Sequence, residues 1–291
     1  MLKQIDHEIG TQQAVFQTIS AYREGGVLFA EIAAPPMNLL GPELVRDLVS
    51  LIQQTEADDS IYVLVFKSAD PDYFISHVDV TRIVEFGELA KQLTGEPSIA
   101  MLLRYLSASR LVTIAQIEGR VRGVGSEFAL ACDMRFAAIE SAIFGQPEVG
   151  FGLIPGSGGV QHLTRLMGRG RALEVLLSAD DYDAEVAERY GLINRALPAA
   201  ALGDFVKSLA HRIASFPAFG LAVIRERVNA VALAPADDFR HDSSLFLECV
   251  RKPEAQNRIK AAMKRGFQTR EAEMALPRIL TGAPRAARAL K

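Results

Sequence analysis

The chain has 291 residues, 49% of them hydrophobic and 23% charged, with a formal net charge of -3. This composition is typical of a folded globular protein and excludes an intrinsically disordered chain. The absence of basic runs argues against a nucleic-acid partner, and no apolar run approaches the roughly 20 residues that a membrane-spanning helix needs.

The first 24 residues are predicted to be an N-terminal extension of the core. Residues 1–11 contain several charges and no apolar core, so no secretory signal is expected. The two cysteines, Cys132 and Cys249, lack zinc-ligand spacing and the density of a disulfide framework, and the five histidines are scattered. These features predict a cytoplasmic protein with reduced thiols and no bound metal.

Short β-type runs alternate with helical patterns through the first two-thirds of the chain. A helix is predicted from Gly41 to Glu56, because its apolar residues recur at helical spacing and Pro42 occupies a permitted first-turn position. The predicted strands cover residues 27–32, 62–66, 112–117, 134–138 and 142–144. This alternation of strands and helices predicts an α/β fold.

From Leu202 onward the sequence shows helical patterns and no convincing strand. We therefore divide the chain into an α/β core over residues 25–201 and a helical subdomain over 202–268. Residues 269–291 are interpreted as a C-terminal tail. Its Ala/Arg-rich end, 284–291, is expected to be loose or docked on a partner.

The segment from Ile117 to Asp133 ends a predicted strand and opens a helix. Gly123 and Gly125 allow the backbone excursion at that junction, and Glu127 lies in the first helical turn. First-turn amides have no intrahelical partner and carry partial positive charge, so they can hold a developing oxyanion. Glu127 is therefore a candidate catalytic carboxylate, although a single glutamate at a helix start more often serves as a capping residue.

A second segment, from Phe144 to Gly159, places Glu148 in a bend among apolar residues. Desolvation there is expected to raise the pKa of Glu148. Two glutamates facing one apolar cleft could divide the acid and base duties of proton transfer next to a thioester carbonyl. The alternative is that Glu148 is a core carboxylate whose oxygens accept hydrogen bonds from backbone N–H groups.

Both segments, in this order and at this separation, resemble the enoyl-CoA hydratase/isomerase (crotonase) family. The resemblance runs from about Val27 to Phe267 and rests on Phe-Gly-Gln-Pro-Glu at 144–148 and Gly-Leu-Ile-Pro-Gly-Ser-Gly-Gly at 152–159. It implies the ClpP/crotonase spiral of repeated β-β-α units with a helical C-terminal subdomain. It also implies a homotrimer or a dimer of trimers, assembled through the helical subdomain.

The resemblance further implies an oxyanion hole formed by the backbone N–H groups of Val78 and Val124. Glu127 and Glu148 match the two glutamates that hold the water added to the double bond, with Glu148 also delivering the proton. The residues expected to bind coenzyme A are Ser76, Val78, Val80 and Asn38. Coenzyme A would arrive as part of an acyl-CoA substrate, with no cofactor bound permanently.

Four positions depart from the family pattern. His77 and Val124 stand where the family usually has glycine, and the C-terminal Phe-x-x-Lys pair aligns with Ile259 and Ala262, so the phosphate-contacting lysine is missing. Lys260 and Lys264 lie close in sequence but project elsewhere from a helix. We expect His77 to be a surface residue of the loop that carries Val78 rather than a catalytic base.

The predicted function is hydration of a 2-enoyl-CoA to a 3-hydroxyacyl-CoA. Another reaction of the same family, such as double-bond isomerisation, thioester hydrolysis or decarboxylation, is the nearest alternative. A second alternative is a catalytically weak subunit that binds acyl-CoA or serves assembly. The acyl group itself is not encoded in any motif that the sequence displays.

Overall fold

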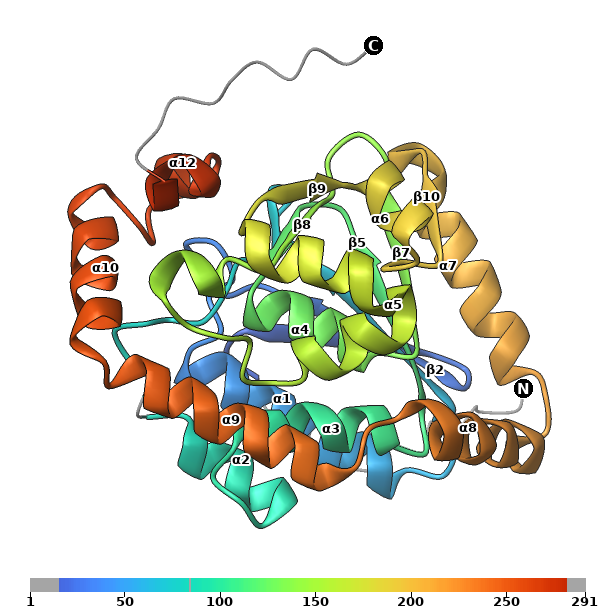
Figure 1. Ribbon diagram of the computed structural model, residues 1–291. Helices are drawn as coiled ribbons and strands as arrows, with labels where there is room; N and C mark the ends of the chain where they lie inside the picture. The colour runs from blue at the N-terminus through green and yellow to red at the C-terminus, as the bar shows by residue number, and fades with distance from the viewer. Residues whose placement is uncertain (1–15, 84, 282–291) are drawn as a thin grey trace, which may run out of the picture.

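The computed structural model describes residues 16–83 and 85–281 (Figure 1). Residues 1–11, interpreted above as lacking a signal, and the Ala/Arg-rich end at 284–291 lie outside the described residues. The strands are β1 (Ile19–Glu24), β2 (Val27–Ile32), β3 (Val63–Ser68), β4 (Tyr73–Ile75), β5 (Val112–Ile117), β6 (Arg120–Arg122), β7 (Met134–Ala138), β8 (Ile143–Gly145), β9 (Asp181–Asp183) and β10 (Arg195–Leu197). The helices are α1 (Pro42–Ala57), α2 (Gly87–Thr94), α3 (Ile99–Ala108), α4 (Val124–Ala131), the 3-10 helix η1 (Glu148–Phe151), α5 (Gly159–Ser178), α6 (Ala184–Tyr190), α7 (Ala199–Ala214), α8 (Ala218–Ala232), α9 (Ala236–Val250), α10 (Pro253–Lys264), α11 (Arg270–Glu273) and α12 (Leu276–Thr281).

The strands form two sheets. One has the order β1-β2-β3-β5-β7-β10 and is parallel except for the β1–β2 pair. The other has the order β4-β6-β8-β9, with only β8 and β9 antiparallel. From β3 to β8, successive strands alternate between the two sheets. The pair β3 and β4 is followed by α2 and α3, the pair β5 and β6 by α4, and the pair β7 and β8 by α5. The α/β class and the repeated β-β-α unit are thus confirmed.

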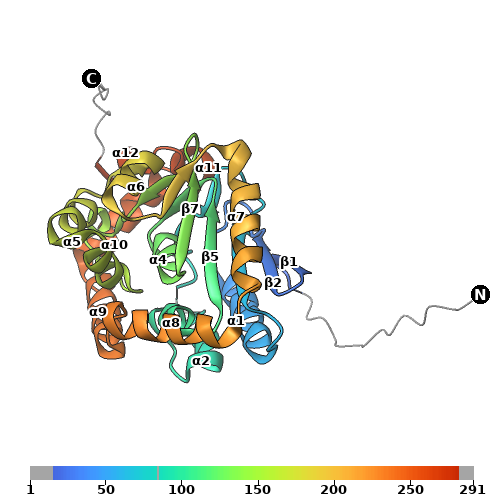
Figure 2. The same cartoon turned by 90° about the vertical axis from the view of Figure 1, so that its right-hand side faces the viewer.

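The larger sheet is covered on both faces, which explains its continuous hydrophobic runs. Helix α7 packs on one face through Leu202, Val206 and Ala210, which are spaced one helical turn apart and fully buried. Helix α4 lies on the opposite side of β5 and β7 (Figure 2). Because α7 begins at Ala199 and completes the sheet's core, it belongs to the α/β unit and not to a separate helical subdomain beginning at 202.

Two other predicted boundaries differ from the structure. The predicted N-terminal extension contains β1, an edge strand with only one buried side chain, which gives a weak hydrophobic pattern. The predicted tail contains α11 and α12, which are too short to be recognised from local periodicity. Leu276 and Ile279 of α12 are buried against Phe151 of η1, so this segment is part of the folded core.

Helix α10 lies along the left edge of the molecule in Figure 1, and α9 runs along its lower edge, below α4. Phe239 anchors α9 by packing on Ala100 of α3, and it is fully buried. Ala255 and Ala262 anchor α10 against η1. These contacts place α9 and α10 beside the segments that contain the two candidate glutamates.

Candidate active site

A close backbone approach brings two separate segments together. A Cβ atom at Gly125 would lie 2.1 Å from the carbonyl oxygen of Ile75, a distance that no side chain tolerates. Glycine at 125 therefore lets the first turn of α4 abut the end of β4. The chain leaving β4 contains Val78, and α4 begins with Val124, so this contact places the two predicted backbone donors beside the same space.

The N–H groups of Val78 and Val124 are free to act as donors. Val124 is the first residue of α4, a position whose N–H has no intrahelical acceptor. Leu40 pairs with the residues on either side of Val78: Leu40 N donates to His77 O at 2.8 Å, and Asp79 N donates to Leu40 O at 3.1 Å. The N–H of Val78 itself is left out of this pairing. Within residues 16–83 and 85–281, no acceptor for either N–H is found.

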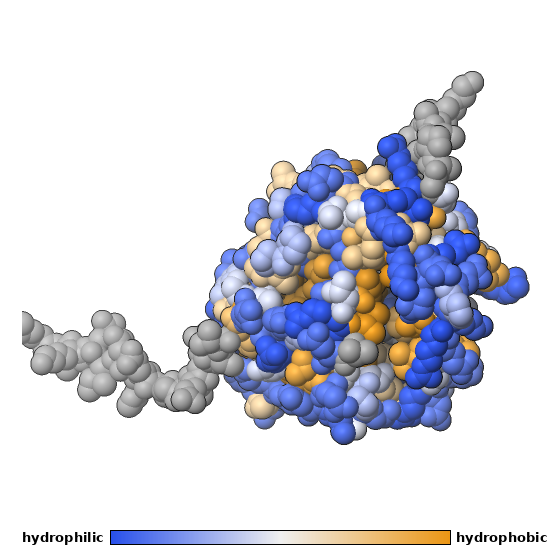
Figure 3. All heavy atoms as spheres, turned by 90° about the vertical axis from the view of Figure 1, so that its left-hand side faces the viewer, coloured by the Kyte–Doolittle hydropathy of each residue, from blue (hydrophilic) through white to orange (hydrophobic). Residues whose placement is uncertain are grey.

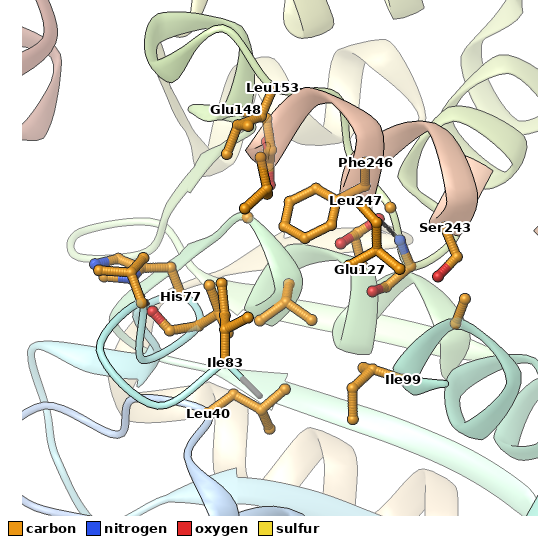
Figure 4. Close-up of a pocket in the computed structure, with 18 of the residues that line it drawn as sticks. Leu40, His77, Ile83, Ile99, Glu127, Glu148, Leu153, Ser243, Phe246 and Leu247 are labelled. Atoms are coloured by element: carbon orange, nitrogen blue, oxygen red, sulfur yellow. Dashed lines mark hydrogen bonds between the residues drawn. The ribbon is translucent and has the colours of Figure 1, made fainter. Parts of the chain in front are cut away.

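Both valines line one large cavity, which encloses about 1100 Å³ including its open mouth. Its walls are mainly apolar, and Figure 4 shows Leu40, Ile83, Ile99, Phe246 and Leu247 around Glu127 and Glu148. On the face that carries α10, Figure 3 shows apolar side chains gathered in a hollow between hydrophilic ones. A site with so few polar groups strengthens any charge interaction made inside it.

Glu127 is held rigidly in the first turn of α4 and is only 2% exposed. Its Oε1 accepts hydrogen bonds from Ser157 N at 2.7 Å and Gly159 N at 2.8 Å. Desolvation outweighs these bonds and raises the pKa of Glu127 to about 7. A carboxyl group with a pKa near neutrality and a fixed orientation suits general acid–base chemistry.

Glu148 begins η1 and is 8% exposed. Its Oε2 has no hydrogen-bond partner among the described residues, and a Cβ at Gly123 would lie 2.9 Å from its Oε1. Burial, followed by repulsion from Glu127, raises the pKa of Glu148 well above its usual value, as the sequence predicted. Backbone N–H groups of other segments donate to Glu127, whereas Oε2 of Glu148 has no partner among the described residues.

Comparisons with known proteins identify the family of this chain. A model of the enoyl-CoA hydratase/isomerase family matches residues 22–271. This chain belongs to the enoyl-CoA hydratase/isomerase family. Members of the family act on acyl-CoA thioesters.

Individual relatives share much of the chain. The short-chain-enoyl-CoA hydratase of Clostridium acetobutylicum is 28% identical over 254 residues, covering 85% of this chain and 97% of its own. A probable enoyl-CoA hydratase of Rhizobium meliloti is 31% identical, covering 79% and 89% respectively. The crystal structure of a putative enoyl-CoA hydratase from Streptomyces avermitilis is similar with a TM-score of 0.91 at 48% identity, covering 95% of this chain and 100% of that one.

His77, which stands where the family pattern has glycine, is not a surface residue as the sequence suggested. It is 3% exposed, and its Nε2 lies 2.9 Å from Oε1 of Glu273. Its ring stacks on Phe267 with centroids 4.6 Å apart. Sequence analysis could not show this burial, because Phe267 and Glu273 lie about 190 positions away along the chain, and Glu273 lies in the segment interpreted as a tail.

The residues expected to bind coenzyme A divide into two groups. Val78 and Val80 line the cavity. Ser76 and Asn38 are fully buried and are not among the lining residues in the described part of the chain. The Ser76 hydroxyl donates to the carbonyl oxygen of Met37, which fixes the loop beside the cavity.

Asn38 uses its whole side chain to hold the turn after β2. Its Oδ1 accepts from Ala34 N at 2.7 Å, and its Nδ2 donates to Ser68 Oγ at 2.8 Å and to the carbonyl oxygens of Tyr73 and Phe74 at 3.1 Å. Its φ of 52° lies in the left-handed region, which asparagine tolerates better than most residues. This network ties the β2–α1 connection to β4.

Asn38→Ala is therefore expected to lower the free energy of unfolding by about 3 kcal/mol, because buried backbone groups lose their partners and alanine is strained at this φ. Asn38→Gly removes the same hydrogen bonds without the strain and should cost less than Asn38→Ala. Urea unfolding measures both. A change within about 0.5 kcal/mol, as for an ordinary surface substitution, would contradict the structural role.

Helix α10 contains the positions that align with the family's Phe-x-x-Lys pair. Ala262 is buried in α10 and Ile259 lines the cavity, whereas Lys260 and Lys264 are exposed. Ser243, Phe246 and Leu247 of α9 also line the cavity. Sequence analysis missed these three, because helical spacing alone does not show which face of α9 covers a site.

Gln146 is another residue that sequence analysis did not single out. Both polar atoms of its buried amide lack a partner among the described residues, and a Cβ at Gly159 would lie 2.6 Å from its Nε2 and 3.2 Å from Oε1 of Glu127. An amide with unmet hydrogen bonds beside Glu127 suits the binding of an ordered water. The available signal was its place within the Phe-Gly-Gln-Pro-Glu string.

None of the helices in residues 16–83 and 85–281 is long and apolar enough to cross a membrane. Within the same ranges, no group of three or more His, Cys, Asp or Glu side chains is arranged to hold a metal ion.

The raised pKa values predict how stability depends on pH. A carboxyl whose folded pKa lies above its unfolded value stabilises the fold least when ionised, so stability is highest below about pH 4.5 and falls as pH rises through the folded pKa. Glu148→Gln should therefore melt at a higher temperature than wild type at pH 8, with the difference shrinking toward pH 4.5. Thermal melts across this range measure it; the exposed Glu188→Gln serves as control and should show no such trend.

Proposed function

We propose that this protein hydrates 2-enoyl-CoA to 3-hydroxyacyl-CoA. The observation that carries the proposal is the juxtaposition, in one apolar cavity, of two buried carboxyl groups with raised pKa values and two backbone N–H groups without acceptors. The reaction needs a site for the oxyanion, a base for water and an acid for carbon, and this set supplies all three.

The steps follow from this placement. The N–H groups of Val78 and Val124 donate to the thioester oxygen, which becomes more negative as the enolate forms. Water, held between Glu127 and Glu148, loses a proton to the ionised carboxylate as its oxygen bonds to C3. Glu148 supplies a proton to C2, and the two carboxyls exchange the gained proton before the next turnover. The sum is one water added across the double bond.

The two carboxyl groups are expected to titrate as a pair, because the charge of Glu127 raises the pKa of Glu148. One must be ionised and one protonated for the proposed steps. Activity should therefore fall on the acid side, where both are protonated, and on the alkaline side, where both are ionised.

Substrate binding completes the proposal. Coenzyme A would enter as part of the substrate, with Val78 and Val80 at its boundary and Ser76 and Asn38 shaping the loops beside it. The apolar cavity walls would hold the acyl group.

We also propose a homotrimer or a dimer of trimers. Helix α8 supports assembly, because none of its residues is buried and it exposes Phe219, Ile224 and Val231. A monomer by light scattering would contradict this assembly.

The test is to incubate purified protein with crotonyl-CoA and longer 2-enoyl-CoAs and follow loss of the conjugated enoyl absorbance. Hydration is expected to yield 3-hydroxyacyl-CoA without release of free thiol or carbon dioxide. Thiol release would indicate a hydrolase, carbon dioxide from a carboxyacyl-CoA a decarboxylase, and conversion of 3-enoyl-CoA to 2-enoyl-CoA an isomerase. Acyl-CoA binding with no turnover would replace the proposal with a binding or assembly role.

A further inference from the structure

Two residues that closely precede the backbone donors contact the same buried residue, Glu273. His77, directly before Val78, contacts Glu273 Oε1 through its Nε2 at 2.9 Å. Arg122, two positions before Val124, donates from Nη1 to the Glu273 carbonyl oxygen at 2.8 Å, and the same nitrogen lies 3.9 Å from Glu273 Oε2. The side chain of Glu273 has no solvent exposure, and those of His77 and Arg122 have almost none.

The His77 ring is held at both of its nitrogens and on one face. Its Nδ1 donates to the carbonyl oxygen of Val78 at 2.7 Å, since a carbonyl oxygen can only accept. One ring face stacks on Phe267 at an interplanar angle of 16°. The imidazole thus links the carbonyl of the donor residue itself to Glu273.

Gln268 adds a second attachment to the same loop. Its Oε1 accepts from Val80 N at 3.2 Å, and its Nε2 donates to Asp79 Oδ1 at 3.1 Å. Its own N–H donates to Glu273 Oε1 at 3.1 Å. Residues 267–273, which we call the C-terminal clamp, therefore grip the loop at residues 77, 79 and 80, on both sides of Val78.

Arg122 is anchored as firmly as His77. Its Nε and Nη2 donate to the two carboxylate oxygens of Asp181 at 2.7 and 2.8 Å, which leaves Nη1 for Glu273. Burying this many charges costs desolvation energy, so such a cluster contributes little net stability compared with an apolar core. Its position beside both donors suggests a different use for it.

We propose that Glu273 is a positioning residue: its carboxylate holds the backbone donor Val78 through His77, and its carbonyl oxygen holds Arg122 beside Val124. This inference rests on the proposed function, because it assigns those donors to the thioester oxygen. Glu273 does not line the cavity in the described structure and so does not touch substrate. Its effect should appear in how strongly a bound thioester carbonyl is polarised.

The test compares Glu273→Ala with Glu273→Gln, which keeps one oxygen able to accept from His77, and with Glu271→Ala, an exposed glutamate of the same short helix. Cinnamoyl-CoA serves as the probe, because polarisation of its carbonyl shifts the absorbance of the bound conjugated system to longer wavelength. Steady-state hydration of crotonyl-CoA and thermal melting are measured on the same proteins.

Glu273→Ala is expected to lose most of the spectral shift and to lower kcat about 10-fold or more, with KM changing about 2-fold or less, because misplaced donors act on the transition state. Glu273→Gln should recover most of both signals, and Glu271→Ala should match wild type. If Glu273→Ala does not fold, Gln268→Ala, which loses the Val80 and Asp79 contacts, should show a partial loss of shift.

Folded variants that melt earlier yet keep the full shift and kcat would overturn the positioning role and leave the proposed function intact. A wild-type protein that shifts the probe but hydrates no enoyl-CoA would refute the proposed function, while the variants' shifts would still decide the role of Glu273. A wild-type protein that binds the probe without any shift would overturn both.

Discussion

Glu148→Gln is expected to lower kcat for hydration of crotonyl-CoA by about 10³-fold, a typical effect of deleting a general acid–base group. The amide keeps the size of the side chain but cannot exchange a proton with water or C2. Any remaining activity should then require Glu127 alone. Stopped-flow or steady-state loss of the enoyl absorbance measures the change.

Glu248→Gln, an exposed glutamate on α9, is the matched control and should retain wild-type kcat. Glu127→Gln is expected to be comparably impaired, and the double variant should be little worse than either single one, because groups that act as a unit are strongly non-additive. Full activity in Glu148→Gln would remove this residue from the mechanism and favour a family reaction that uses one carboxyl group.

Val124→Pro is expected to lower kcat by about 10²-fold, because it deletes one of the two oxyanion donors without touching either glutamate. Proline is well tolerated at the first position of a helix, where its missing N–H has no intrahelical partner, and Val124 is that position in α4. The loss should therefore be one of chemistry rather than of folding, with the thermal melt showing a small change.

Val124→Ala keeps the N–H and shortens the same side chain, so it separates the backbone donor from the apolar wall. It should stay within about 3-fold of wild type in kcat, since no transition-state donor is lost. Equal losses in the proline and alanine variants would show that Val124 acts through its side chain and would contradict the backbone oxyanion hole.

Local patterns predicted the parts of this protein that local physics determines. The buried strands were visible as short β-branched and aromatic runs, and the glycines at 123 and 125 marked the turn into α4. The same short range explains why Glu127 and Glu148 could be recognised: each lies within a few residues of the glycines and prolines that shape its backbone. The raised pKa of Glu148 could be predicted once both glutamates were placed in one apolar cleft.

The parts that escaped prediction depend on contacts between distant segments. Nothing near His77 indicates that it is buried, because Phe267 and Glu273 cover it. Strand β1 exists because β2 offers it an edge, and α11 and α12 are too short to form without tertiary support. The cavity wall contributed by α9 belongs to the same class, since its position is set by the packing of Phe239 on α3.

The separation of 196 positions between His77 and Glu273 has a consequence for how the protein is made. Contacts this distant in sequence form late, because a long loop must close before they can contribute. During synthesis from the N-terminus, the strands and both glutamates leave the ribosome well before the segment that fastens the Val78 loop. A chain that stops short of residue 273 would thus carry Glu127 and Glu148 but lack the contacts that hold the Val78 loop.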